Sequence, residues 1–253
     1  VGDFVSRNSY GNDIVFEIVD IRGDVAILRG ISVRLIADSP MDDLVISDNR
    51  DEYEPDIVLD NLDRDEFFYL PGKVLHIDGD ESYLNSSLDY YKKNSVKAVG
   101  KCIDEDKIED SIKDLLVLTK PDIVVITGHD AFYDRDNSYK NSKYFINSVK
   151  IAREYEKSYE KLVIIAGACQ SDYEELIKSG ANFASSPKRV NIHALDPAVI
   201  AVNIALTNKN DSVNIKELLN KTKYGSKGMG GLLGNGMMYI GYPRWKYVAN
   251  EKN

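Results

Sequence analysis

Two residues able to do nucleophilic chemistry, a histidine and a cysteine, each stand directly after an apolar run. His129 follows residues 122–128 (DIVVITG), and Cys169 follows residues 162–168 (LVIIAGA). Short, β-branched runs without alternation are typical of strands buried on both faces of a parallel sheet. A neutral imidazole can generate or stabilise a thiolate, which is the nucleophilic form of cysteine. The pair therefore indicates covalent catalysis by a thiol.

The segment between the two runs predicts how they are positioned. Residues 141–156 read as a helix, so the two strands form a βαβ unit and run parallel. Parallel strands bring their carboxyl ends to one edge, where open α/β sheets place their sites. A helix capped by Ser171 and ended by Gly180 is expected next, and its amino terminus would lower the pKa of Cys169.

The same alternation of strand and helix runs through most of the chain from Lys73. Strands are predicted at residues 74–78, 96–102, 122–128, 162–168 and 182–186. Helices are predicted at residues 82–93, 106–119, 141–156, 171–180, 196–206 and 214–222. Repeated βα units of this length predict an α/β fold with a doubly wound, mostly parallel sheet and right-handed crossovers.

The first part of the chain has a different pattern. Residues 1–46 predict short strands at 3–7, 14–20, 25–29 and 33–37, separated by turn signals, which suggests a small SH3-like β-barrel. We expect a scaffold or substrate-positioning module. Residues 47–70 read as an acidic linker, expected to be a solvated loop; Arg50 and Arg64 would be cleavage points only if the chain cut after Arg and processed itself. Residues 71–253 form the α/β domain, with a glycine-rich C-terminal segment that predicts a terminal hairpin or a flap.

Composition excludes several classes of function. The net charge of −9, from 32 basic and 41 acidic residues, disfavours a general nucleic-acid binder and suits a cationic substrate. Two cysteines give no disulfide framework, and three histidines without close Cys or His spacing make a structural zinc site unexpected. No apolar run approaches eighteen residues, so we expect no membrane span. Cys102 reads as a small structural hydrophobe.

Five segments carry a resemblance to a known family: residues 35–40 (LIADSP), 71–80 (PGKVLHIDGD), 127–130 (TGHD), 167–171 (GACQS) and 182–197 (NFASSPKRVNIHALDP). An apolar block ending in His, followed by one ending in Ala-Cys, resembles the caspase-like cysteine peptidases, which include caspases, gingipains and clostripain. Across most of the chain the sequence is similar to the YabG family of sporulation-specific peptidases.

The resemblance implies a cysteine endopeptidase that cleaves after basic residues, preferably Arg. Its substrates would be spore coat or germination precursor proteins, and its location the mother-cell cytoplasm or the spore coat, without a cofactor or metal. Cys169 would attack the carbonyl, and His129 would protonate the leaving amine. The oxyanion would be held by the N–H of Cys169 and one beside His129, from Gly128 or Asp130. Caspase-like enzymes usually have Gly after the His, where this chain has Asp130.

The resemblance also implies a carboxylate in the pocket for the residue before the cleaved bond, the P1 residue. The loop after the first strand of the sheet lines this pocket in part in caspase-like enzymes. Asp78 and Asp80 are therefore the candidates, with Asp172 behind them. His193 is expected to contact substrate in the cleft. Aspartates at strand ends also commonly serve as solvated or capping residues.

Two other functions stay open at the level of sequence. Cys169, His193 and Asp196 occur in the order of a nucleophile-elbow amidohydrolase, such as a glutamine amidotransferase, with Asp196 orienting His193. The second open function is that of a non-enzymatic coat-assembly scaffold, which would bind partners through the barrel and the acidic linker. Residues 228–236 resemble a phosphate-binding loop only in their glycines, because no strand precedes them and no Gly-Lys-Ser/Thr follows.

Overall fold

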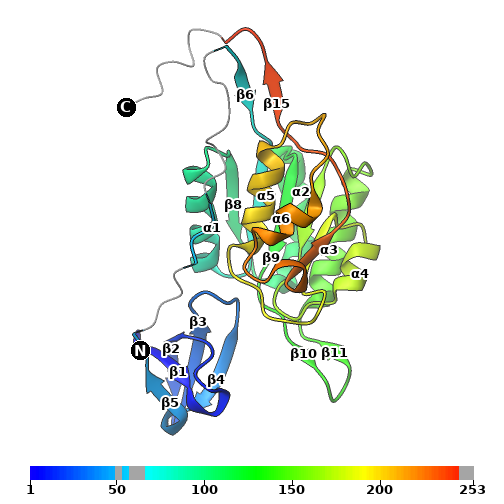
Figure 1. Cartoon of the computed structure of the whole chain (residues 1–253). Coiled ribbons are helices and arrows are strands. Elements are labelled where there is room, and N and C mark those ends of the chain that lie inside the picture. The colour runs from blue at the N-terminus through cyan, green and yellow to red at the C-terminus, as the bar shows by residue number, and fades with distance from the viewer. Residues whose placement is uncertain (49–52, 57–65, 245–253) are drawn as a thin grey trace.

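The computed structural model describes residues 1–48, 53–56 and 66–244 (Figure 1). Arg50, Arg64 and part of the predicted acidic linker lie outside these residues. Among the described residues, no helix is long and apolar enough to cross a membrane. Two main sheets organise the chain: five antiparallel strands built from its first part and six largely parallel strands from the remainder.

The six-stranded sheet confirms the predicted mostly parallel α/β arrangement. Its order is β14-β13-β12-β9-β7-β8, and only the edge strand β14 runs antiparallel to its neighbour. The strands are β7 (Val74–Asp78), β8 (Ala98–Cys102), β9 (Ile123–Thr127), β12 (Val163–Ala166), β13 (Phe183–Ser185) and β14 (Met229–Gly231).

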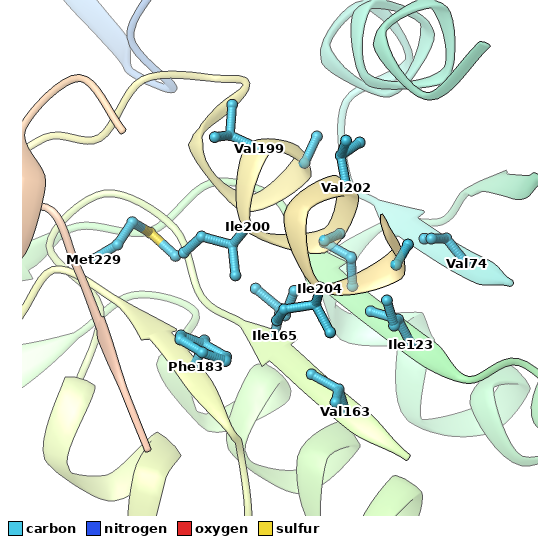
Figure 2. Packing of buried hydrophobic residues seen from close by; sticks show 14 of the residues in the cluster. Val74, Ile123, Val163, Ile165, Phe183, Val199, Ile200, Val202, Ile204 and Met229 are labelled. Atoms are coloured by element: carbon cyan, nitrogen blue, oxygen red, sulfur yellow. The ribbon is translucent and has the colours of Figure 1, made fainter. Parts of the chain in front are cut away.

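Helices cover both faces of this sheet, which explains why its central strands are apolar without alternation. One face packs on α1 (Glu81–Lys93), α5 (Asp196–Leu206) and α6 (Ile215–Asn220). The other packs on α2 (Ile108–Thr119), α3 (Ser142–Tyr155) and α4 (Tyr173–Lys178). All eleven residues of α5 are buried. Its Ile200 and Ile204 lie over Ile165 of β12, as Figure 2 shows.

The five-stranded sheet has the order β4-β3-β2-β1-β5. Its strands are β1 (Phe4–Arg7), β2 (Phe16–Arg22), β3 (Val25–Gly30), β4 (Ile36–Pro40) and β5 (Leu44–Ile46). A separate small core of Val5, Phe16, Ile18, Ala26 and Leu28 lies within it. Short 3-10 turns occur at η1 (Asn8–Tyr10), η2 (Met41–Asp43), η4 (Glu105–Lys107) and η5 (Gly225–Lys227).

The strand predicted at residues 33–37 is wrong for its first half, because β4 begins only at Ile36. Residues 31–35 form a connection between β3 and β4, and Val33 makes an antiparallel bridge with His193 of the α/β part. Gly30 makes the turn possible, since an added Cβ would lie 2.2 Å from the carbonyl oxygen of Val33. The β3–β4 connection therefore joins the five-stranded sheet to the chain between β13 and α5.

The glycine-rich segment does not form the predicted terminal hairpin. Its first strand, β14, extends the six-stranded sheet. Its second, β15 (Tyr239–Gly241), pairs with β6 (Phe68–Leu70) at the end of the molecule away from the five-stranded sheet (Figure 1). A small hairpin of β10 (Phe132–Tyr133) and β11 (Ser138–Tyr139), which the sequence did not predict, follows His129.

Arg153 links the end of α3 to the chain around β12. Its guanidinium donates to the carbonyl oxygens of Glu156, Ser158, Leu162 and Gly180 and to the side chain of Asn182. We expect Arg153→Met to lower the free energy of unfolding by about 2–4 kcal/mol, because several partly buried acceptors lose their donor. Lys150→Met, at an exposed position of the same helix, should change it by less than about 0.5 kcal/mol. Urea unfolding measures both, and equal effects would contradict this role.

Candidate active site

Three parallel strands end at the same edge of the six-stranded sheet. In the register of β7, β9 and β12, Asp78 lies opposite Thr127, and Ala166 lies opposite Ile126. The loops that leave β9 and β12 carry His129 and Cys169. The two residues thus follow neighbouring strand ends, as the βαβ pattern predicts.

Cys169 is fully buried at this edge. The N–H of Ile192 donates to its Sγ at 3.3 Å, and Sγ lies 3.8 Å from the Ile192 carbonyl oxygen. Burial raises the pKa of the thiol to about 12, even though Arg34 lies beside it and acts to lower the pKa. The expectation of a lowered pKa is therefore wrong for this arrangement. The helix that follows, α4, begins only at Tyr173, and desolvation is the largest cause of the shift.

The loop that carries Cys169 is braced against the loop that carries His129. Ser171 Oγ accepts from the N–H of Ala168 at 2.8 Å and donates to Asp130 Oδ2 at 3.0 Å. Asp130 also accepts from Ser142 Oγ and from the N–H of Asn141. Burial raises the pKa of Asp130 despite these donors. The network fixes the separation between the loops that carry Cys169 and His129.

His129 is held by Asp80 and Glu105. Its Nε2 lies 3.3 Å from Asp80 Oδ2, and its backbone N–H donates to Glu105 Oε1 at 2.7 Å. Nδ1 is buried and has no hydrogen-bond partner among the described residues. Gly128 leaves space for Glu105, because an added Cβ would lie 2.4 Å from that carboxylate. No hydrogen bond joins His129 to Cys169 in the described part of the chain.

Asp80 serves two partners with its two oxygens. Oδ1 accepts from the N–H groups of Ser82 and Tyr83 and so caps α1, while Oδ2 faces the imidazole of His129. Burial raises the pKa of Asp80, but the hydrogen bonds from His129 and Tyr83 outweigh it and hold the pKa below its ordinary value. A charged carboxylate is therefore fixed beside the imidazole.

Asp78 pairs with an arginine that the sequence did not single out. Arg34, in the β3–β4 connection, donates from Nη1 to Oδ1 at 2.9 Å, and its Nη2 lies 2.7 Å from Oδ2. Both side chains are fully buried. Burial alone would raise the pKa of Asp78, but the charge of Arg34 holds it well below its usual range. An Arg within the apolar run Val33–Leu35 gives no local signal of this role.

The remaining predicted residues lie in other arrangements. Asp172 caps α4 by accepting from the N–H of Glu175. Cys102 is exposed at the end of β8. His76 is buried in β7, with its ring nitrogens 3.0 Å from Tyr91 Oη and 2.9 Å from Thr127 Oγ1. No group of three His, Cys, Asp or Glu residues that could hold a metal ion occurs in the described ranges.

His193 and Asp196 do not form the orienting pair of the amidohydrolase hypothesis. His193 Nδ1 accepts from the N–H of Leu195 at 3.1 Å. Asp196 accepts from the backbone N–H groups of His193 and Lys223 and does not bond to the imidazole. Burial, with Arg34 nearby, lowers the pKa of His193 to about 4, and burial raises the pKa of Asp196 to about 6.

These shifts predict opposite effects of pH on stability. The unfolded chain protonates His193 near pH 6.5 but the folded chain only near 4, so its contribution is lost as the pH falls through that range. The folded chain keeps the Asp196 proton up to about pH 6, against 3.8 unfolded, so its contribution is lost as the pH rises.

Urea unfolding at about pH 6.5 and about pH 4.5 tests this difference. On acidification, His193→Gln should lose less stability than the unsubstituted protein, and Asp196→Asn should lose more. Parallel changes in all three proteins would show that neither group is shifted.

Comparison with known proteins gives the family. Residues 1–62 and 56–243 match the family described as YabG peptidase U57. The chain is 42% identical to the sporulation-specific protease YabG of Bacillus subtilis (strain 168), in an alignment of 282 residues that covers 96% of this chain and 97% of that protein. The chain therefore belongs to the YabG family of proteases, peptidase family U57.

Proposed function

We propose that the protein is a cysteine endopeptidase with Cys169 as its nucleophile. The observation that carries the proposal is the position of Cys169 and His129 directly after two neighbouring parallel strands, β12 and β9. A thiol and an imidazole at one sheet edge supply the nucleophile and the proton donor that peptide cleavage needs. The protease family supports the same reading.

In this mechanism Nδ1 of His129 takes the thiol proton, Sγ of Cys169 attacks the carbonyl carbon, and the protonated imidazole delivers that proton to the departing amine as the C–N bond breaks. Water then hydrolyses the thioester, which releases the carboxyl product and returns a proton to Sγ. Asp80 faces Nε2, so it favours the tautomer with the proton on Nε2 and leaves Nδ1 as the nitrogen free for proton transfer. Asp80 is thus a positioning residue for His129. This role differs from the pocket role that the sequence suggested for it.

Backbone N–H groups are proposed to hold the developing oxyanion. In the described chain, neither the N–H of Cys169 nor that of Asp130 donates to a backbone carbonyl. Both follow strand ends at the same edge, and the Asp130 side chain is held by Ser142 and Ser171. Gly128, the other candidate, provides the space that Glu105 fills. We therefore favour Cys169 and Asp130.

Preference for Arg at P1 is proposed from Asp78. Its two carboxylate oxygens already hold the guanidinium of Arg34 in a bidentate pair, so the site fits this group. Asp78 is favoured over Asp80 and Asp172, which cap helices. His193 would contact substrate as a neutral side chain, because burial and Arg34 keep its pKa low.

The wider context follows the family resemblance. We propose a caspase-like domain at residues 71–253 and an SH3-like barrel at residues 1–46, joined by the segment 47–70. Five antiparallel strands in the order β4-β3-β2-β1-β5 support the barrel. The relative's description as sporulation-specific supports spore coat or germination precursors as substrates, in the mother-cell cytoplasm or the spore coat.

Digestion of an unstructured protein rich in Arg and Lys tests the activity. We expect fragment masses that end in Arg, with cleavage after Lys slower, because Lys offers one point contact where Arg offers a fork of donors. Cys169→Ala should give no fragments, whereas Cys102→Ala should cut normally. Cleavage after Asp, or an active Cys169→Ala, would overturn the proposal.

Asp80→Asn separates positioning of His129 from binding of Arg. We expect kcat to fall by orders of magnitude, up to the ~10⁴-fold cost of a misoriented histidine, with KM within about twofold of the original. The kcat of His129→Ala should fall by ~10²–10⁴-fold. Asp172→Asn is the matched control, because Asp172 also caps a helix but does not contact His129.

Rescue by a longer carboxylate distinguishes a positioning role from a general loss of structure. Asp80→Glu should restore part of the kcat that Asp80→Asn loses, because it again offers a carboxylate to Nε2 of His129. Equal kcat in the two variants, or a rise in KM confined to Arg substrates, would contradict the assignment.

A further inference from the structure

The β3–β4 connection covers the thiol of Cys169. Arg34 lies within it, and its backbone N–H is close enough to Sγ to act on the thiol pKa. The same N–H donates to the Ile192 carbonyl oxygen at 3.4 Å, and Ile192 in turn contacts Sγ. Cys169 has no exposed surface. The thiol is therefore closed off from solvent, and the β3–β4 connection is among the segments that lie beside it.

The backbone of this segment pairs with the chain at residues 192–194 as an added strand. Val33 bridges His193 in antiparallel register, and the N–H of Ala194 donates to the Ser32 carbonyl oxygen at 2.9 Å. Peptides commonly bind by adding a strand in this way, with the backbone giving affinity and side-chain pockets giving specificity. Residues 32–34 therefore lie as a bound peptide would lie beside the nucleophile.

The side chain of Arg34 completes the likeness to a bound peptide. Besides its bidentate pair with Asp78, it donates from Nε and Nη2 to the Ala194 carbonyl oxygen at 3.2 and 3.1 Å. Its guanidinium carbon lies 5.0 Å from the ring centre of Tyr83. A guanidinium held by a fork of acceptors and an aromatic ring is what a P1 arginine requires.

The segment is also fixed on both sides of Arg34. Tyr83 Oη lies 2.6 Å from the Gly30 carbonyl oxygen and 3.0 Å from that of Val33. The N–H of Gly30 donates to the Leu35 carbonyl oxygen at 2.7 Å, and β4 starts at the next residue. The chain thus turns back into the five-stranded sheet directly after Arg34. An occupant anchored at both ends stays in place, whereas a free peptide diffuses away.

We propose that residues 32–35 occupy the substrate site of their own chain, with Arg34 in the P1 pocket, so that the protease is latent until this segment is displaced. The inference rests on the proposed function, because it takes Cys169 as nucleophile and Asp78 as the P1 carboxylate. An incoming Arg substrate competes with Arg34 for the same carboxylate. The apparent affinity for that substrate equals the intrinsic affinity multiplied by the fraction of molecules in which the segment is displaced.

The test compares Arg34→Ala with Arg22→Ala in a Cys102→Ala background, where Cys169 is the only thiol. Arg22 is an exposed arginine of the same sheet, paired with Asp20. Two rates are measured on each protein. One is the rate of Cys169 modification by iodoacetamide, detected by mass spectrometry, and the other is the rate of hydrolysis of a short Arg peptide. We expect both rates to rise about tenfold or more in Arg34→Ala, because the competent fraction increases, and to stay unchanged in Arg22→Ala.

Benzamidine provides a second measurement, because Arg34→Ala leaves Asp78 buried without its partner and lowers stability. This amidinium should fill the vacated pocket, raise the Tm of Arg34→Ala and inhibit its hydrolysis, with little effect on the Tm of Arg22→Ala. A variant that remains unfolded even with benzamidine would assign Arg34 to the fold alone and overturn the proposal.

The two readouts separate this inference from the proposed function. Hydrolysis that depends on Cys169 but does not increase in a folded Arg34→Ala would overturn latency and leave the peptidase intact. Rapid modification of Cys169 in the unsubstituted protein would also overturn it. Faster modification of Arg34→Ala without any hydrolysis would support the covering segment and overturn the peptidase function.

Discussion

The arrangement of this edge of the sheet depends on the buried ion pair between Arg34 and Asp78. Two charges without access to water cost several kcal/mol each unless their remaining donors and acceptors are satisfied. Here Asp78 also accepts from Thr127 Oγ1 and the N–H of Asp80, and Arg34 donates to the Ala194 carbonyl oxygen. One pair therefore connects β7, β9, the chain at residues 192–194 and the five-stranded sheet.

Burial by the same segment explains the electrostatic state of the site. Desolvation is the largest cause of both shifts: it raises the pKa of Cys169 against the opposing charge of Arg34, and it lowers the pKa of His193 in the same direction as Arg34. Cys169 is therefore a thiol and His193 a neutral imidazole at pH 7. In the proposed latent state, displacement of the segment readmits water to the thiol and removes the main obstacle to its ionisation. Closing the site and suppressing the ionisation of Cys169 then have one physical cause.

Local patterns in the sequence predicted the parts of the site that local structure determines. The β-branched runs before His129 and Cys169 identified two strands, and the rule for parallel strands placed their ends together. The role of Arg34 could not be predicted, because it depends on contacts with residues 44 and 160 positions away. The run Val33–Leu35 looks like any short strand. The strands β10, β11, β14 and β15 have three residues or fewer, so they carry too little periodicity to be recognised.

In the proposed latent state, the position of residues 32–35 between β3 and β4 couples the five-stranded sheet to the Cys169 site. Because the segment is part of the folded chain, it reaches high occupancy with few contacts, as a tethered ligand does. The coupling in this proposal is reciprocal. A ligand that binds the five-stranded sheet more tightly when the segment is displaced raises the affinity of the Cys169 site for substrate. Substrate bound at the Cys169 site raises the affinity of the sheet for that ligand by the same factor. Under this proposal the first part of the chain is more than a passive scaffold, since its β3–β4 connection supplies the arginine that competes with substrate.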